Sequence, residues 1–391
     1  MLNGNGKELN PKCAVQLLEQ SSANGNGIAS LLLGLLYENG EGVTNDFDKA
    51  ESYYTKSAEQ GNSSGEQRLS LCYKTGYGVE QNNSKAIEHY KNAADLGNSF
   101  AMSNLGNLYD NGDGVDQNSA KAFEYYQNSV NHGNISALNN LAYMYAVGKG
   151  VNQDYSKSLE CYQKLDEFND SEALNTLGLL YYNGKGVEKD SSKAFEYYEK
   201  SANLGNSKAL FNLGYLYEKG DGVDQDYNKA IECYEKSADL GNSKAIFNLA
   251  LLYKNGNGVE QDYAKAAEYY QKAADQGSSD AYFNLGSLFE NEDFTKKDDQ
   301  KAFNYYQKPA DLGNSDALFK IGSFYANGKI VKQDYSKSIE FYQKAADLNN
   351  SDALFNLGSA YLYGRGVDRD PSKSIEFYQK SADLGNSDAL F

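Results

Sequence analysis

Hydrophobic and polar positions recur along this chain of 391 residues with a fixed period of 36 residues. The stretch NLGNLYDNGDGV at 104–115 returns as NLGYLYEKGDGV at 212–223 and as NLALLYKNGNGV at 248–259. The period holds from residue 29 to the C-terminus without an insertion, which gives ten full repeats. Self-similarity at a period of roughly 20–50 residues is the signature of repeat architectures, so we expect an array rather than one compact core.

Each repeat contains two apolar stripes with helical spacing. The first keeps apolar or small residues at i, i+4, i+7 and i+8: Ala101, Leu105, Leu108 and Tyr109. The second, within 122–130, has them at i, i+1, i+4 and i+8. Each stripe covers one face of an amphipathic helix. The sequence therefore predicts an all-α protein whose repeat is two antiparallel helices, called helix A and helix B.

Polar residues mark where helix B begins, and glycines mark where it ends. A carboxylate at the N-cap accepts hydrogen bonds from backbone N–H groups and suits the positive end of the helix dipole. A glycine after the last turn adopts the left-handed conformation that other residues resist. We predict the N-cap at Asp46, Asp154, Asp190, Asp226 and Asp262, and the C-terminal glycine at Gly61, Gly97, Gly205, Gly241 and Gly313.

A polar, glycine-rich loop joins the two helices, as in DNGDGVDQNSAKA at 110–122. A calcium loop is excluded, because Gly114 at position 6 would place Tyr109 at position 1 and Ala120 at position 12. A phosphate loop is excluded as well, because Val115 follows Gly114 where Lys and Ser/Thr are needed. The residue between the two glycines is acidic in some repeats and basic in others. We interpret the loop as a structural turn without a metal ligand.

Composition narrows the classes of partner. The formal net charge is −17 and the pI is about 4.7. Nucleic acids and anionic membrane surfaces attract concentrated Lys and Arg, so we expect neither as a partner. A run of roughly 18 apolar residues, which a membrane-spanning helix needs, does not occur. The start, MLNGNGKELN, lacks the pattern of a signal peptide.

The repeat resembles the Sel1-like repeat family, a branch of the tetratricopeptide-type helical repeats. The family pattern is roughly A…LG..Y..G.GV..D..KA..YY.KAA..G. The sixth repeat matches it at Ala209, Leu213, Gly214, Tyr217, Gly220, Gly222, Val223, Asp226, Lys229, Ala230, Tyr234, Lys236, Ala238 and Gly241. The resemblance covers nearly the whole chain. It implies a right-handed α-α superhelical solenoid whose A helices line a concave face, and a role as a scaffold or adaptor for other proteins.

The resemblance leaves an alternative, in which the repeats regulate a catalytic domain outside this chain. We expect no enzyme activity, cofactor or metal in the chain itself, because His89 and His132 have no evident nucleophile or metal partner in the sequence. Some secreted relatives carry two Cys in each repeat, a pattern that this chain lacks. We predict that Cys13, Cys72, Cys161 and Cys233 are buried, free thiols. Free thiols are typical of a reducing compartment, so we expect a cytoplasmic protein.

Two segments make up the predicted domain organisation. Residues 1–26 are expected to be an N-terminal capping segment with one helix in register with a helix B, on the basis of Ala14, Leu17, Leu18 and Gly25. Residues 27–391 are expected to be the solenoid, with ten repeats and the start of an eleventh. The last residues, SDALF, begin a further helix A, so we expect the chain to be a fragment of a longer protein.

Two columns of helix A are candidates for partner contact on a concave face. An asparagine ladder can donate to and accept from an extended peptide backbone, and a phenylalanine stripe can hold apolar side chains. The candidates are Asn104, Asn140, Asn212, Asn248, Asn284, Asn356, Phe211, Phe247, Phe283, Phe319 and Phe355. Arg68, Thr176 and Lys320 interrupt the asparagine column. The alternatives are asparagines that bond only to neighbouring repeats or water, and phenylalanines that belong to the core.

Three places break the pattern. Residues 164–170, KLDEFND, replace the usual end of helix B, and residues 291–299, NEDFTKKDD, lose both loop glycines. Pro309 falls inside a helix B, where it removes a hydrogen bond and is expected to kink the helix. These places represent either drift in a tolerant array or a local bend or contact loop.

Overall fold

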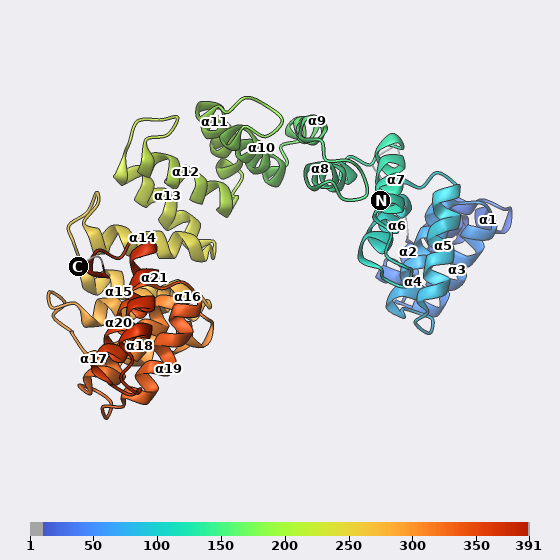
Figure 1. Cartoon of the computed structure of the whole chain (residues 1–391). Coiled ribbons are helices and arrows are strands. Elements are labelled where there is room, and N and C mark those ends of the chain that lie inside the picture. Colours follow the sequence, from blue (N-terminus) through green and yellow to red (C-terminus); the bar gives the residue numbers. More distant parts are fainter. Residues whose placement is uncertain (1–10, 390–391) are drawn as a thin grey trace. The chain divides into compact units, whose positions relative to one another are not determined.

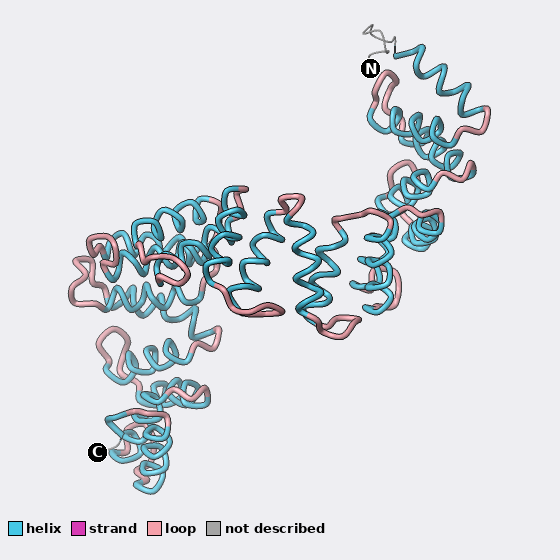
Figure 2. The backbone as a smooth tube through the Cα atoms, turned by 90° about the horizontal axis from the view of Figure 1, so that it is seen from above, coloured by secondary structure: helices cyan, strands magenta, loops and turns pink. Residues whose placement is uncertain are grey.

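A computed structural model describes residues 11–389 of the protein. These residues form helices joined by turns and loops, and no strand occurs among them (Figures 1 and 2). The predicted all-α fold is therefore confirmed. The chain divides into two compact halves, Met1–Ser201 and Ala202–Phe391, which are called the N-half and the C-half and are described separately.

The N-half is built from helices of nearly uniform length. They are α1 (Pro11–Ala23), α2 (Gly27–Asn39), α3 (Phe47–Glu59), α4 (Ser63–Thr75), α5 (Asn83–Asp95), α6 (Ser99–Asn111), α7 (Ser119–Asn131), α8 (Ala137–Val147), α9 (Tyr155–Asp166), α10 (Ser171–Asn183) and α11 (Ser191–Asn203), whose last two residues fall in the C-half. Even-numbered helices correspond to helix A and odd-numbered helices to helix B.

The C-half continues the same alternation. Its helices are α12 (Ser207–Lys219), α13 (Tyr227–Asp239), α14 (Ser243–Asn255), α15 (Tyr263–Asp275), α16 (Ser279–Glu290), α17 (Asp299–Asp311), α18 (Ser315–Asn327), α19 (Tyr335–Asp347), α20 (Ser351–Tyr363), α21 (Pro371–Asp383) and the short 3₁₀ helix η1 (Ser387–Ala389). In both halves the most extensive contacts join a helix A to the helix B that follows it, and smaller ones join that helix B to the next helix A.

Helix ends follow the predicted cap chemistry. Asp46, Asp154, Asp226 and Asp262 are N-caps, and each accepts a hydrogen bond from the backbone N–H three residues later. Asp190 accepts the same bond from the N–H of Lys193, at 2.9 Å. The five predicted C-terminal glycines all have positive φ, between 76° and 85°. The sequence located these ends because the interactions that fix them are local.

The glycine loop is a closed turn, as predicted. In the loop after α6, Gly112 and Gly114 have φ of 75° and 74°. The N–H of Asn118 donates to the carbonyl of Tyr109 at 2.8 Å, and the side chain of Gln117 donates to the carbonyl of Asp110 at 2.7 Å. Both ends of the loop are therefore tied together by the chain's own groups.

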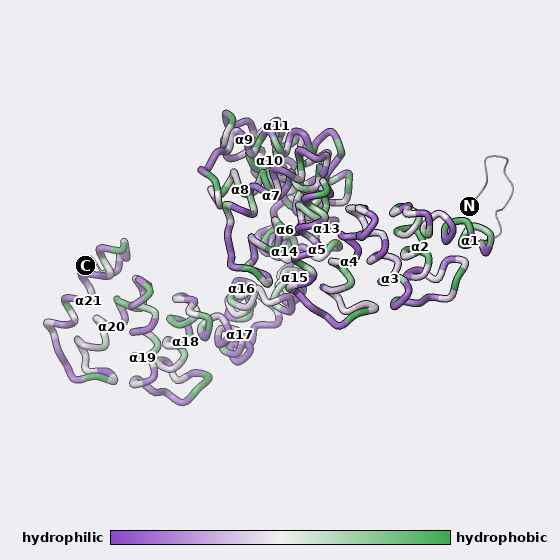
Figure 3. The backbone as a smooth tube through the Cα atoms, turned by 90° about the vertical axis from the view of Figure 1, so that its right-hand side faces the viewer, coloured by the Kyte–Doolittle hydropathy of each residue, from purple (hydrophilic) through white to green (hydrophobic). Residues whose placement is uncertain are grey.

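A tyrosine of helix B forms the centre of each repeat, and it is buried in all repeats but the last, where Tyr378 is half-buried. In the pair α6·α7, Tyr126 is 3% exposed, and its ring lies against Gly106. A Cβ added at Gly106 would lie 2.5 Å from Cε1 of Tyr126, so glycine makes room for the ring. Small residues such as Ala101 and Ala122 are completely buried beside it. Hydrophobic and hydrophilic residues alternate along the helices, as expected for amphipathic helices (Figure 3).

The irregular places keep the helical pairing. Helix α9 ends at Asp166, and Asn169, with φ of 52°, occupies the left-handed position that glycine holds in most repeats. In the segment 291–299, Phe294 is only 3% exposed and contacts Phe289. Helix α17 runs through Pro309 to Asp311 without a break. Pro309 thus removes one hydrogen bond without ending the helix.

The first and last helices of the described chain lie at the positions that the 36-residue period assigns to a helix B and a helix A, respectively. Helix α1 occupies the position of a helix B, and η1 begins where an eleventh helix A is predicted. The rest of the predicted capping segment, residues 1–10, and residues 390–391 lie outside the described residues. The division into residues 1–26 and 27–391 stays a prediction.

Candidate functional site

Both candidate columns lie on A helices. The asparagines are on α6, α8, α12, α14, α16 and α20, and each candidate phenylalanine of the C-half immediately precedes the asparagine position of its helix. All eleven side chains are half-buried. Because adjacent residues point about 100° apart around a helix, the two columns form two parallel rows rather than one.

Each phenylalanine contacts the central tyrosine of helix B in its own repeat. The ring-centroid distances are 5.7 Å for Phe211–Tyr234, 5.5 Å for Phe247–Tyr270, 5.4 Å for Phe283–Tyr306, 5.7 Å for Phe319–Tyr342 and 5.3 Å for Phe355–Tyr378. These distances are typical of favourable aromatic pairs. The phenylalanines therefore pack within a repeat and remain partly exposed.

The asparagines make different hydrogen bonds in different repeats. Asn248 donates to the hydroxyl of Tyr234 in the preceding repeat, at 3.0 Å. Asn284 and Asn356 instead donate to carbonyls one turn earlier on their own helices, at 2.8 and 2.9 Å. A side-chain amide has two N–H donors and a carbonyl acceptor, so each of these bonds uses only part of its capacity.

Two interruptions of the asparagine column are explained by ion pairs. Arg68 lies 3.5 Å from Glu38, and Lys320 lies 2.8 Å from Glu290, in each case 30 residues earlier on the preceding helix A. The same carboxylates accept hydrogen bonds from the hydroxyls of Tyr54 and Tyr306. The sequence contained a signal for this network. In the asparagine column a cation stands only at positions 68 and 320, and in both cases a glutamate stands 30 residues earlier.

The buried tyrosine hydroxyls have unusual acid–base properties. Burial, and then the hydrogen bond from its hydroxyl to Glu290, raises the pKa of Tyr306 far above its ordinary value. Burial and the charge of Asp110 raise the pKa of Tyr126 to about 12. The physical cause is the same throughout the column, because a phenolate in a low-dielectric interior is costly.

Tyr270 departs from the rest of this network. Its hydroxyl is buried and has no hydrogen-bond partner among the described residues. Asn284 stands at the position equivalent to Asn248, one repeat later, yet donates to Asp280 rather than to Tyr270. An unsatisfied buried hydroxyl costs on the order of 1–3 kcal/mol. The polar contacts of the tyrosine column are therefore incomplete at Tyr270.

A lysine covers the same helix A ring in every repeat, which is a tyrosine in nine repeats and Phe289 in the other. The lysine three residues after the helix B N-cap lies over this ring, with Nζ 4.1 to 5.4 Å from its centroid; Lys49 over Tyr37 and Lys265 over Tyr253 are examples. In most repeats an aromatic residue one turn later on helix B, such as Tyr53, stacks on the same ring. These contacts give the invariant lysine a structural role.

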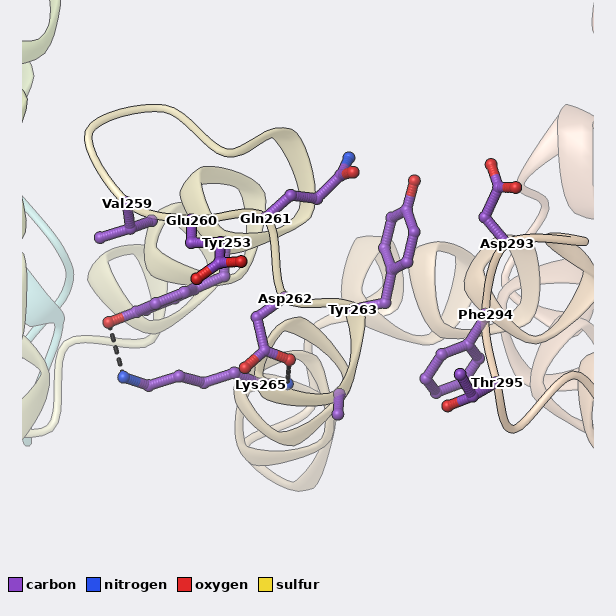
Figure 4. Close-up of a pocket in the computed structure, with 11 residues that line it drawn as sticks. Tyr253, Val259, Glu260, Gln261, Asp262, Tyr263, Lys265, Asp293, Phe294 and Thr295 are labelled. Carbon is purple, nitrogen blue, oxygen red and sulfur yellow. Dashed lines mark hydrogen bonds between the residues drawn. The ribbon is translucent and has the colours of Figure 1, made fainter.

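A cavity of about 520 Å³ opens beside the irregular loop of the C-half (Figure 4). In regular repeats a loop glycine packs against the start of the preceding helix B; a Cβ at Gly258 would lie 2.2 Å from Cβ of Tyr227. Phe294 takes that place in the irregular loop, and its ring centroid lies 6.5 Å from that of Tyr263. The larger side chain holds the two segments apart, and carboxylates line the opening: Glu260, Asp262 and Asp293.

Candidate catalytic groups are few. His89 stacks on Tyr73 at 5.4 Å, and its Nδ1 lies 2.6 Å from Glu66, a partner that the sequence did not indicate. His132 contacts the carbonyl of Asn128 at the end of α7. No group of three or more His, Cys, Asp and Glu suited to a metal ion occurs among the described residues. No helix in residues 11–389 is long and apolar enough to cross a membrane.

The cysteines are free, as predicted, but they are not all buried. Cys13 is exposed, and the other three are half-buried. Cys13 lies on α1, at a position where helix B of every repeat carries its surface lysine, which explains the exposure. Burial and the nearby charges of Glu38 and Glu51 raise the pKa of the Cys72 thiol to about 11, which makes it a poor nucleophile.

These repeated helix pairs, with their tyrosine–glycine cores and closed loops, define an α-solenoid of short helical repeats. The Sel1 repeat model matches residues 1–26, 28–62, 63–98, 99–134, 135–165, 171–206, 207–242, 243–278, 279–314, 315–350 and 351–386. The chain therefore belongs to the Sel1 repeat family. The matches leave out residues 166–170, within one of the segments that break the sequence pattern.

Solved structures of family members are similar to this chain. One is c5321, a protective antigen of uropathogenic Escherichia coli, with 32% identity and a TM-score of 0.83 over 99% of this chain and 83% of that one. Another is a Sel1 repeat protein from Oxalobacter formigenes, with 26% identity and a TM-score of 0.64 over 77% of this chain and 87% of that one. A search of curated proteins gives no match.

Proposed function

We propose that this chain is a non-enzymatic scaffold that binds extended peptide segments or short helices of other proteins along its helix A side. Membership of the Sel1 family supports the general role, because proteins of this fold are generally non-catalytic scaffolds. The observation that carries the specific proposal is the pairing of two half-buried rows on the same helices, one of amides and one of phenyl rings.

The C-half is the stronger candidate for the groove. It holds all five phenylalanines together with Asn212, Asn248, Asn284 and Asn356. Each phenyl ring contacts a tyrosine behind it, so it presents apolar surface without needing to move. Amides beside the rings can bond to a peptide backbone while the rings bind alternate side chains. A preformed surface of this kind lowers the entropic cost of binding.

The proposal is tested by affinity capture with a matched pair of variants. Asn284→Ala with Asn356→Ala removes two groove amides, and Asn255→Ala with Asn327→Ala removes two exposed asparagines at helix ends. Proteins captured by the unmodified chain should be lost with the first pair and kept with the second, at equal melting temperatures. If the variant with Asn284→Ala and Asn356→Ala still captures the same proteins, the asparagine row is not part of the binding site.

The phenylalanine row is tested by stability. Because Phe247 and Phe283 are half-buried, changing either to Ser should cost less than the roughly 3–5 kcal/mol lost when a fully buried phenylalanine is truncated. Urea unfolding of each single variant measures this cost. A cost in that range or above would place the rings in the core and withdraw them from the groove.

A further inference from the structure

An apolar groove lies between α1 and α2 in the N-half. It has a volume of about 420 Å³ and is lined by Ala14, Leu17, Leu18, Leu32, Leu35, Leu36, Asn39 and Glu41. Leu17 on α1 is 57% exposed and Leu32 on α2 is 39% exposed, so each helix contributes exposed apolar surface to the groove. None of the eleven candidate asparagines and phenylalanines lines this groove.

The other repeats show what normally covers this face. Ala14, Leu17 and Leu18 stand 36 residues before Ala50, Tyr53 and Tyr54 of α3. In that repeat Tyr53 stacks on Tyr37 of α2, and the ring of Tyr54 lies against Gly34 of α2. The corresponding face of α1 is therefore the contact surface for a helix A, here called the α1 seat. Among the described residues, α2, which belongs to the next repeat, is the helix A that makes extensive contacts with α1.

The α1 seat differs chemically from every other helix B face. Where Lys49 lies over Tyr37 in the α2·α3 pair, α1 carries Cys13, which cannot make a cation–π contact. Where other repeats have an aromatic residue, His or Cys, α1 has Leu17, and Leu18 replaces the tyrosine found in all ten repeats. The seat is aliphatic. It lacks the groups that hold the tyrosine of this chain's own A helices.

We propose that the α1 seat binds an amphipathic helix of another protein whose apolar face carries Leu, Ile or Met instead of Tyr. Since Leu18 is smaller than tyrosine, the bound helix does not need the glycine that makes room for a ring in the chain's own repeats. Glu41 is the one charged residue among those lining the groove, and it favours a Lys or Arg at the margin of the bound helix. This is the helix-in-groove mode of recognition.

The test uses two fluorescently labelled peptides and the full chain. One has the α12 sequence, residues 207–219, and the other has the same sequence with Gly214→Ala and Tyr217→Leu. Both are held helical by a lactam bridge between solvent-facing side chains, and circular dichroism verifies that they are equally helical. Fluorescence anisotropy should show that the substituted peptide binds at least about tenfold more tightly, because only its apolar face matches the aliphatic seat.

Variants of the seat locate the binding. Leu17→Glu with Leu32→Glu should weaken binding of the substituted peptide by about tenfold or more, whereas Leu240→Glu, at an exposed leucine on α13's C-cap, should leave it unchanged. Unchanged melting temperatures show that the variants fold. The proposal is overturned by no binding, by equal or tighter binding of the unmodified α12 peptide, or by equal loss in the Leu240 variant. Self-association of the chain that the seat variant abolishes would also overturn it, because the occupant would then be a second copy.

Discussion

A glycine of helix A meets the central tyrosine of helix B in seven repeats, and a Cβ at these glycines would lie 2.4 to 2.8 Å from the ring. Ala142 and Ala250 occupy the same position in two other repeats. Ser70 occupies it in the remaining repeat and is completely buried. A small unbranched side chain is therefore tolerated, but the space for a branched one is missing. The tyrosine ring therefore limits the side-chain volume possible at the glycine position, and a small residue there leaves space for the ring.

Substitution of Gly106 measures this limit. Gly106→Ala should change stability little, because the helix-forming advantage of alanine, about 1 kcal/mol, offsets part of the crowding against Tyr126. Gly106→Val should destabilise the protein by a further ~1–3 kcal/mol, because its methyl groups need space that the ring fills. Urea unfolding of both variants measures the difference. Equal stability of the two variants would show that the Tyr126 ring moves freely.

The residue-scale interactions that the sequence missed are those between neighbouring repeats. Columns of equivalent residues predicted which side chains share a position, and the predicted N-caps are confirmed. The Glu38–Arg68 pair joins residues of two different columns, so repetition alone does not reveal it. The ring contacts of the phenylalanines also needed coordinates, because periodicity does not say which residue of helix B each one meets.

At the scale of elements, the irregular loop shows why equal length does not mean equal structure. The segment 291–299 keeps the closing hydrogen bond, from the N–H of Asp298 to the carbonyl of Phe289 at 3.0 Å. It loses the close glycine contact with the preceding repeat and buries Phe294 instead. The sequence predicted that this loop would differ. It could not predict the cavity, which depends on how a phenylalanine fits against Tyr263.

Hydrogen exchange should distinguish the irregular elements from their regular counterparts. Backbone amides in 164–170 and 291–299 should exchange about tenfold faster than those in 200–206 and 255–263, which are the equivalent segments one repeat away. The physical reason is weaker local closure; the N–H of Asp170 reaches the carbonyl of Leu165 only at 3.4 Å. Mass spectrometry of peptic fragments measures all four segments in one experiment. Equal protection in each matched pair would contradict the prediction.

At the scale of the whole molecule, stability is a sum of terms within repeats and between neighbours. The same tyrosine column contributes in nearly every repeat, so a condition that acts on it acts on the whole array. Burial raises the pKa of these hydroxyls above the ordinary value of 10.0 in Tyr54, Tyr90, Tyr126, Tyr162, Tyr198, Tyr234, Tyr270, Tyr306 and Tyr342. The array is therefore linked to pH through one residue type.

The direction of that linkage predicts alkaline unfolding. A group whose folded pKa is raised contributes stability that is complete below its unfolded pKa and is lost as pH rises towards the folded pKa. For Tyr126 and Tyr162 this window extends from 10.0 to about 12. Within its window, each such tyrosine should lower the free energy of unfolding by ~1.4 kcal/mol per pH unit.

Melting followed by circular dichroism should thus show a steep fall of the melting temperature above about pH 10, together with the ultraviolet absorbance of phenolate. Tyr126→Phe with Tyr162→Phe should make the fall less steep, since two titrating groups are removed. Helices that stay intact while most tyrosines ionise would show that the hydroxyls reach solvent without unfolding.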